Sequence, residues 1–187
     1  MHYGVDPSLV TIDLVESNNR LVPVAPEDVS AKILERMRKL GVNIFLNRQL
    51  VSEEVEQIYL KDMNMKSNTL IWTAGTKLNS LFEKIDGLSF SPRKRVLVDE
   101  YLRAVGFDNV FVGGDAASTT FAGLAQTAIF DRKYIANAIE KVVMKKDLKQ
   151  YKAKPVAFSI PIGDDWGVFV WGSIRLYGRL GYFIRHV

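Results

Sequence analysis

Apolar residues gather in short runs separated by polar turns, a pattern that predicts alternating strands and helices. Residues 9–15 are mostly apolar or β-branched and predict a buried strand. Residues 26–40 predict a helix, because proline and two acids open it and a glycine follows it. Residues 42–46 predict the next strand, so the order matches a parallel βαβ unit. The apolar stripe expected on this helix comprises Val29, Ile33, Met37 and Leu40.

Shorter elements are predicted in the middle of the chain. Residues 50–61 alternate in two pieces and indicate a small antiparallel excursion, and residues 69–73 predict a buried strand. Residues 96–98 and 109–112 predict two further short strands. A helix is expected over residues 122–143, with an inward face made of Ala125, Ala128, Ile129, Ala136, Ile139 and Val143.

The C-terminal part has a different pattern. Residues 156–162 and 166–171 predict a hairpin, with Gly163, Asp164 and Asp165 as its turn. Residues 173–187 are basic and amphipathic, which fits a helix lying in a membrane interface or an ordinary helix that covers a sheet. One face of this helix would carry Tyr177, Leu180, Ile184 and Val187, and another Arg175, Arg179, Tyr182 and His186.

Composition excludes several classes of protein. Of 187 residues, 48% are hydrophobic and 25% charged, which is typical of a globular protein and not of a disordered chain. The sequence has no cysteine, which excludes a disulfide scaffold, a thiolate nucleophile and an iron–sulfur site. Only two histidines, His2 and His186, are present at the two ends, which argues against a histidine triad or a multi-histidine metal site.

The charge of the chain is uneven. The net charge is +4, but residues 141–187 hold nine Lys or Arg against three Asp. Such a basic segment is compatible with nucleic acid or with anionic lipid. No secretory signal and no uncharged apolar run of spanning length is found, so a cytoplasmic location is expected.

Familiar catalytic motifs are missing from this sequence. It contains no GxGxxG, no GxxxxGK[ST], no HExxH and no GxSxG. No catalytic side chain and no metal ligand is therefore assigned.

Two weak candidate sites follow predicted strands. Glu16 ends the first strand, where an acid in a dinucleotide fold accepts hydrogen bonds from an adenosine ribose. Taken alone, Glu16 is better explained as an acid in a surface loop beside Arg20. Gly75 follows residues 69–73, and a small residue there lets the backbone approach a ligand, although a plain turn needs one too.

The strongest candidate site combines a glycine turn with the start of a helix. Gly114, Asp115 and Ala116 follow a predicted strand, at the edge where α/β proteins bind ligands. The alternative is a local turn capped by Asp115. The small residues around Gly123, Leu124 and Ala125 would let an anionic group approach the free amides of the next helix.

In this order, the motifs resemble the FAD-dependent pyridine nucleotide oxidoreductases with two dinucleotide-binding domains, especially the type II NADH:quinone oxidoreductases. The resemblance covers residues 8–185 and includes VTIDLVESNNRLVP, NTLIWTAGTKLN, VLVDEYLRAVGFDNVFVGGDAAS and GLAQTAIFDRKYIANAI. Both GxGxxG loops of the family lie upstream of the matching part, so the chain resembles the C-terminal half of such an enzyme and is not expected to be active alone.

The resemblance implies an α/β fold of the Rossmann-like FAD/NAD(P)-binding kind, with a C-terminal β-hairpin and amphipathic helix. Residues 1–75 would belong to the NAD-binding domain and residues 76–143 to the FAD-binding domain. Residues 144–187 would form an extension that faces a membrane or a partner.

The resemblance also implies chemistry: hydride passes from NADH to FAD, and electrons pass on to a quinone-like acceptor. Asp115, with its neighbours Gly114 and Ala116, would hold the ribityl chain of FAD, and the amides of Gly123, Leu124 and Ala125 would stabilise reduced flavin. Glu16 would hold the ribose of NADH, Gly75 would pass near the nicotinamide, and Gln126 would face the quinone. Family members often carry glutamines that face the quinone near Phe130 and Asp131, and this chain retains only Gln126.

Partners follow from the same resemblance. Peripheral contact with the inner face of the cell membrane and a homodimer are compatible with it, and nucleic acid is not expected. The alternative function is a non-catalytic α/β interaction module that docks on an anionic membrane or a protein through its basic tail.

Overall fold

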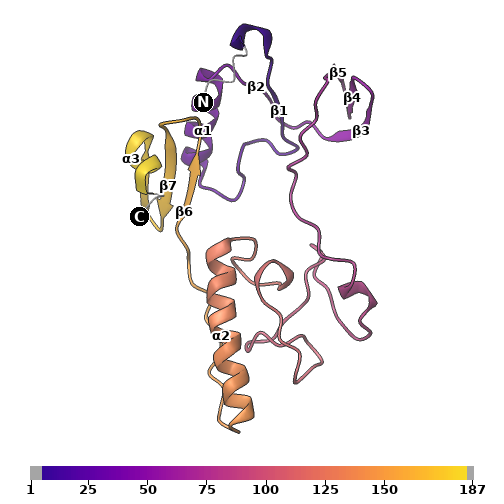
Figure 1. The fold of residues 1–187 in the computed structure, drawn as a ribbon, viewed down its shortest axis with the longest axis vertical. Helices are drawn as coiled ribbons and strands as arrows, with labels where there is room; N and C mark the ends of the chain where they lie inside the picture. Colours follow the sequence, from indigo (N-terminus) through magenta and orange to yellow (C-terminus); the bar gives the residue numbers. More distant parts are fainter. Residues whose placement is uncertain (1–5, 185–187) are drawn as a thin grey trace. The chain divides into compact units, whose positions relative to one another are not determined.

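A computed structural model describes residues 6–184 and divides them into two compact units (Figure 1). One unit comprises the residues up to Thr73 together with those from Phe158 onward, and the other comprises Ala74–Ala157. The segment 144–187, expected as one extension, is thus shared between the two units.

The first unit is built on a βαβ arrangement. Strands β1 (Asp13–Val15) and β2 (Asn43–Phe45) pair in parallel, with Leu14 opposite Ile44, and α1 (Glu27–Lys39) connects them. Pro26 is the N-cap of α1, acids occupy its first turn, and Gly41 follows it with a φ of +82°. The predicted strand–helix–strand order is confirmed.

Two antiparallel sheets complete this unit. Strands β3 (Leu50–Glu54), β4 (Gln57–Leu60) and β5 (Asn64–Lys66) form one sheet, which confirms the predicted antiparallel excursion and adds a strand. The other sheet consists of β6 (Phe158–Pro161), β7 (Gly167–Trp171) and β8 (Ile174–Tyr177), followed by helix α3 (Gly178–Phe183).

The core of the first unit joins α1 to the C-terminal hairpin. Val29 and Ile33 of α1 pack with Ile162, Val168 and Val170 of the hairpin region, as α1 beside β6 and β7 in Figure 1 illustrates. Of the other two predicted members of the α1 stripe, Met37 is half-buried and packs against this core, whereas Leu40 is exposed.

No regular strand forms between Ala74 and Ala157, the residues of the second unit. A short 3-10 turn, η2 (Phe82–Lys84), precedes irregular loops whose core contains Val96, Ala104, Val112 and Ala117. The strands predicted over 96–98 and 109–112 appear only as isolated bridges, such as the one between Val96 and Ala117. A second turn, η3 (Gly114–Ala116), leads to the long helix α2 (Ala125–Val143).

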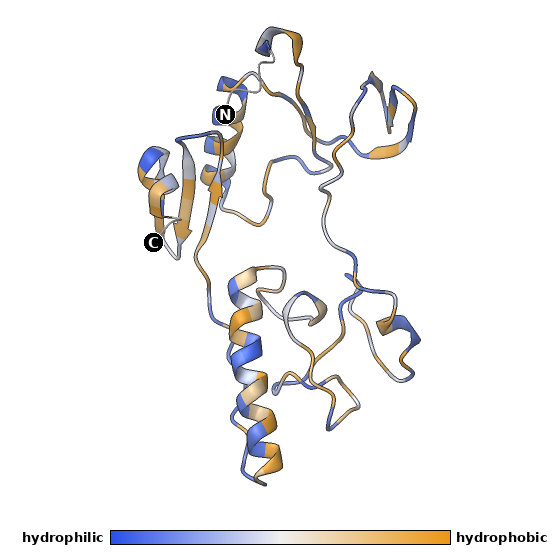
Figure 2. Cartoon of the chain, in the orientation of Figure 1, coloured by the Kyte–Doolittle hydropathy of each residue, from blue (hydrophilic) through white to orange (hydrophobic). Residues whose placement is uncertain are grey.

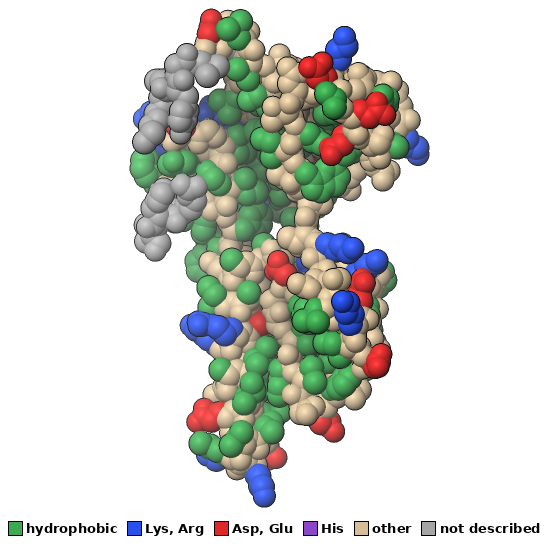
Figure 3. Space-filling model, turned by 45° about the vertical axis from the view of Figure 1, so that its right-hand side comes forward, with side chains coloured by type: hydrophobic (Ala, Val, Ile, Leu, Met, Phe, Trp, Pro, Cys, Tyr) green, Lys and Arg blue, Asp and Glu red, His purple; other side chains and the backbone are tan. Residues whose placement is uncertain are grey.

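Helix α2 is confirmed, but its predicted inward face is wrong. Ala125, Ile129, Ala136, Ile139 and Val143 are exposed, and Ala128 is half-buried. The buried positions are Thr127, Asp131 and Ala138. Figure 2 accordingly shows hydrophobic and hydrophilic residues interspersed along α2, and in Figure 3 hydrophobic side chains reach the surface of this unit.

The burial expected of residues 9–15 and the strand expected at 69–73 are not what the structure shows. Only Asp13–Val15 of residues 9–15 form a strand, while Leu9, Val10 and Ile12 are exposed, because β2 is the only described neighbour of β1. Residues 69–73 form no strand, and Leu70, Ile71 and Trp72 are exposed, because no described strand pairs with them.

The helix predicted over residues 173–187 is much shorter in the structure. Its first part is strand β8, which continues the sheet, and α3 has only six residues. Arg185, His186 and Val187 lie outside the described residues, as does His2. Of the described helices, none has the length and apolar character needed to cross a membrane.

We expect Val29→Ala to lower the free energy of unfolding of the first unit by about 2 kcal/mol, because it removes two methyl groups from a fully buried side chain. Val24→Ala is the matched control, since Val24 is 83% exposed in the same unit, and it should change stability by less than about 0.5 kcal/mol. Urea unfolding followed by tryptophan fluorescence measures this unit selectively, because Trp72, Trp166 and Trp171 all belong to it. Equal effects of the two substitutions would contradict the described core.

Candidate functional site

The twin-glycine turn packs directly against α2. Gly113 has extended backbone, and Gly114 has a φ of +62°, a conformation that favours glycine. A Cβ atom placed on Gly113 would lie 2.9 Å from Cδ1 of Ile135, and one on Gly114 would lie 3.3 Å from Cβ of Ala128. The close approach of the turn to α2 therefore requires both glycines.

A buried carboxylate of α2 holds this turn. Asp131 has no exposed surface; its Oδ2 accepts a hydrogen bond from the Gly114 amide at 2.8 Å, and its Oδ1 accepts one from the Tyr151 hydroxyl at 2.5 Å. Burial and the hydrogen bond to Asp131 raise the pKa of the Tyr151 hydroxyl. No role was predicted for Asp131 from the sequence. Its spacing could have indicated its role: Thr127, Asp131 and Ile135 are four positions apart and therefore lie on one face of the helix.

Asp115 sits in the middle of η3 with its side chain exposed. No hydrogen bond or ion pair joins its carboxylate to any residue in the described range. The alternative reading, a carboxylate that caps its own turn, is therefore not what the geometry shows. Ala116, next in the turn, is half-buried and packs against the core of the second unit.

The amino-terminal end of α2 is open. Leu124, its N-cap, is extended, no side chain caps the helix, and no acid occupies the first turn. The amides of Ala125, Gln126 and Thr127 therefore point out of the helix without an intrahelical acceptor. Gln126 is exposed on this first turn.

Two further features make this end of α2 suitable for an anionic or electron-rich group. Gly123 has a φ of +99°, and a Cβ atom placed on it would lie 3.1 Å from the guanidinium Nη2 of Arg95. The guanidinium therefore adds its charge to the positive end of the helix dipole. The hydroxyl oxygens of Thr119 and Thr127 are buried without a hydrogen-bond partner in the described part of the chain. Arg95, Thr119 and Thr127 were not predicted from the sequence as residues of this site.

Glu16 lies at the carboxyl end of β1. Its amide donates to the carbonyl of Phe45 at 2.9 Å, and its Oε1 accepts from the amide and the side chain of Asn18 at 2.8 and 2.6 Å. Burial alone would raise the pKa of the Glu16 carboxyl, but hydrogen bonds from Asn18 and Ser17 outweigh it and lower the pKa. Oε2 has no partner in residues 6–184, so one oxygen can still accept a hydrogen bond.

Arg20, which the surface-loop alternative placed beside Glu16, does not pair with it. Its guanidinium donates instead to the carbonyl oxygens of Ala25 and Pro23, each at 2.6 Å. Gly75 has a φ of +109° and no atom within 4 Å of a Cβ placed on it, so its backbone is open to solvent.

Two arginines of the C-terminal sheet and helix are held by acids. Nη1 of Arg175 lies 2.6 Å from Oδ1 of Asp28, and Arg179 pairs with Asp165 at 3.4 Å. Tyr177 donates to the other oxygen of Asp28 at 3.0 Å. Burial would raise the pKa of the Asp28 carboxyl, but the bonds from Arg175 and Tyr177 lower it overall. These arginines therefore join parts of the first unit.

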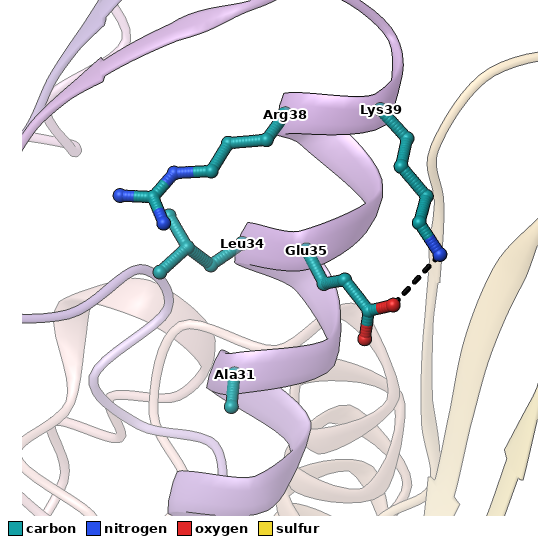
Figure 4. Close-up of a pocket in the computed structure, with 5 residues that line it drawn as sticks. All are labelled: Ala31, Leu34, Glu35, Arg38 and Lys39. Atoms are coloured by element: carbon teal, nitrogen blue, oxygen red, sulfur yellow. Dashed lines mark hydrogen bonds and ion pairs between the residues drawn. The ribbon is translucent and has the colours of Figure 1, made fainter.

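A shallow concavity also lies on the outer side of α1. Ala31, Leu34, Glu35, Arg38 and Lys39 line it, and Lys39 pairs with Glu35 at 2.7 Å (Figure 4). Its lining consists of exposed or half-buried residues of one helix, and no candidate residue from the sequence contributes to it.

The fold of this chain is similar to the folds of several solved oxidoreductases. The structure of NDH2 from Plasmodium falciparum in complex with NADH matches 96% of this chain and 54% of that chain, with a TM-score of 0.81 and 15% identity. A NAD-dependent persulfide reductase from A. fulgidus matches 86% of this chain and 31% of that chain, with a TM-score of 0.69 and 16% identity. At these identities the matches show the fold, which is that of two-domain FAD/NAD-binding flavoproteins.

Residues 8–138 match the family model described as pyridine nucleotide-disulphide oxidoreductase, and the chain belongs to this family. The type II NADH:quinone oxidoreductase of Haemophilus influenzae is 28% identical over 158 residues, which are 80% of this chain and 36% of that protein. The protein of the same description from Staphylococcus saprophyticus is 22% identical over 197 residues, covering 99% of this chain and 48% of that protein. The chain thus spans half or less of the length of these relatives.

Replacing Asn18 should change the titration of Glu16. Because the pKa of Glu16 is below its ordinary value of 4.5, its hydrogen bonds add stability above that value, and this contribution is lost as the pH falls through the lower folded-state pKa. We expect Asn18→Ala to raise the pKa of Glu16 by removing the side-chain donor. The control Asn19→Ala, at an exposed residue with no described hydrogen bond, should leave it unchanged. NMR titration of the Glu16 carboxyl carbon measures both, and an unchanged pKa in Asn18→Ala would contradict the described geometry.

Proposed function

We propose that this chain forms part of an FAD-dependent oxidoreductase that passes hydride from NADH to FAD and electrons to a quinone-like acceptor. The observation that carries the proposal is the unpartnered carboxylate of Asp115, on a glycine turn packed against α2, whose amino-terminal end is uncapped. Family membership and the named activity of the relatives support the same assignment.

The residues of the second unit fit the groups that FAD presents. A free carboxylate accepts hydrogen bonds from sugar hydroxyls, so Asp115 would hold the ribityl chain, with the backbone of Gly114 and Ala116 close to it. The amides of Gly123, Leu124 and Ala125, with the guanidinium of Arg95, would stabilise negative charge at the flavin ring. The unpartnered hydroxyl of Thr127 in the first turn also fits a polar ligand, because buried hydroxyls normally have a partner.

Two of the predicted residues would contact the nicotinamide nucleotide: Glu16 of the first unit and Gly75 of the second. The free Oε2 of Glu16 would accept a hydrogen bond from the adenosine ribose, and the open backbone of Gly75 would pass near the nicotinamide. A carboxylate at this position repels a 2′-phosphate, which favours NADH over NADPH.

The cofactors would supply the hydride and electron chemistry, and the side chains would bind and orient them. This division of roles explains why a chain without cysteine or internal histidine can take part in redox catalysis. Gln126, exposed on the first turn of α2, is the residue that we assign to the acceptor side.

We expect Asp115→Ala to weaken FAD binding about tenfold or more, because it removes the acceptor of a charged hydrogen bond. Quenching of FAD fluorescence during titration with the chain measures the affinity. Asp147→Ala is the matched control, because Asp147 is an exposed acid of the same unit, and its effect should stay within about twofold. Equal affinities of wild type and Asp115→Ala would contradict the role of Asp115.

The alternative function, a module that docks on anionic membranes, has one observation in its favour. Leu180 and Phe183 of α3 are 58% and 62% exposed, and Trp171 and Ile174 of the adjoining strands are exposed as well. The arginines that would contact lipid headgroups are instead paired with Asp28 and Asp165. Within the proposed enzyme, the same apolar group would provide peripheral membrane contact.

Flotation with vesicles of anionic lipid tests this contact. We expect the double substitution Leu180→Ala/Phe183→Ala to reduce the floated fraction severalfold, because it removes most of the exposed apolar surface of α3. Leu9→Ala is the control, since Leu9 is 81% exposed elsewhere in the same unit. A form of the protein that includes both GxGxxG loops, floats through α3 and still binds no FAD would favour the docking module over the enzyme.

A further inference from the structure

A carboxylate buried in the middle of a helix needs a function or a strong partner, because its transfer from water is costly. Asp131 has two partners: the amide of Gly114, 17 positions earlier, and the hydroxyl of Tyr151, 20 positions later. Neither partner belongs to α2, so the carboxylate connects the helix to two separate loops of the second unit.

We propose that Asp131 and Tyr151 are positioning residues that lock the Gly113–Gly114 turn against α2 and so fix the direction in which Asp115 faces. This inference rests on the proposed function, because it assigns to Asp131 and Tyr151 a role in FAD binding without contact with FAD.

The turn needs an external lock. Glycine has the greatest conformational freedom of all residues, and the turn contains two, Gly113 and Gly114. Because η3 is only three residues long, it does little to restrict them. The side chain of Asp115 has no partner of its own in the described part of the chain, so only the backbone orients it. Gly114, which donates a hydrogen bond to Asp131, is the residue directly before Asp115. This bond therefore fixes the backbone from which the Asp115 side chain projects.

Contacts with Glu100 and Tyr134 hold Tyr151 and the residues just before it in place. Its amide donates to the carbonyl of Glu100 at 2.7 Å, and its ring meets that of Tyr134 edge to face with centroids 5.2 Å apart. The hydroxyl of Tyr134 donates to the carbonyl of Lys149 at 2.6 Å. Residues 149–151 are thereby held so that the Tyr151 hydroxyl can stabilise the charge of Asp131.

Three variants separate this lock from general folding. Asp131→Ala removes the acceptor, Asp131→Asn keeps an acceptor of the same shape for Gly114, and Tyr151→Phe removes only the second donor. Glu140→Ala is the matched control, because it removes an exposed carboxylate from the same helix. Asp131→Asn and Tyr151→Phe keep the test decisive if Asp131→Ala does not fold, as judged by circular dichroism.

The amide resonance of Gly114 reports the lock without FAD. We expect a downfield proton shift and slow hydrogen exchange in the wild-type chain, both lost in Asp131→Ala, reduced in Tyr151→Phe and largely kept in Asp131→Asn. Glu140→Ala should leave the resonance unchanged. An unchanged Gly114 amide in Asp131→Ala, or in both milder variants if that one is unfolded, would overturn the proposal.

Titration with FAD tests the consequence for binding. We expect the dissociation constant to rise about tenfold in Asp131→Ala and about threefold in Tyr151→Phe, with Asp131→Asn recovering most of the loss and Glu140→Ala unaffected. If Asp115→Ala weakens binding while Asp131→Ala does not, the positioning role is wrong and the proposed function stands. If the wild-type chain binds no FAD, the Gly114 resonance alone decides whether Asp131 locks the turn.

Discussion

The buried carboxylate of Asp131 is the constraint on which the second unit depends. Between Ala74 and Ala157 there are isolated bridges but no regular strand, so this unit consists of loops packed with one long helix. A charge without exposed surface is stable there only with strong donors, and the amide of Gly114 and the hydroxyl of Tyr151 supply them. This one group connects the glycine turn and Tyr151 to the buried face of α2.

The first unit uses a different device, in which acids on α1 and the hairpin turn bind arginines and a tyrosine. Asp28 receives Arg175 and Tyr177 from β8, and Asp165 lies between Arg36 of α1 and Arg179 of α3. These pairs are partly exposed and each contributes little alone. They do set the orientation of the hairpin on α1, while the buried contacts of Val29 and Val168 supply the packing energy.

Local signals in the sequence predicted where helices and strands form more accurately than they predicted which side chains are buried. The bounds of α1 follow from Pro26, the acids after it and Gly41, all of which act within one turn of the helix ends. The inward face of α2 could not be predicted by counting apolar positions, because its most buried residue is an acid whose partners lie 17 and 20 positions away. The burial expected of residues 9–15 and the strand expected at 69–73 failed for a related reason, since both depend on neighbouring strands that lie elsewhere in the sequence.

The candidate site shows the same division. Glu16 and Asp115 were recognised because each is an acid directly after an apolar run, which is a local pattern. Arg95, Thr119 and Thr127 were not, because the closeness of Arg95 to Gly123 and the missing partners of the two hydroxyls arise only in the folded unit. Their roles in binding remain predictions.

The parallel pair of β1 and β2 has a consequence for how this chain behaves in concentrated solution. Each strand has one described neighbour, so its outer row of amides and carbonyls is available, and the exposed side chains of Val10 and Ile12 lie just before it. Open edges of this kind are templates for the addition of foreign strands, which is the first step of aggregation. Charged or proline substitutions at Val10 and Ile12 are therefore the first changes to make when the chain is prepared for structural work.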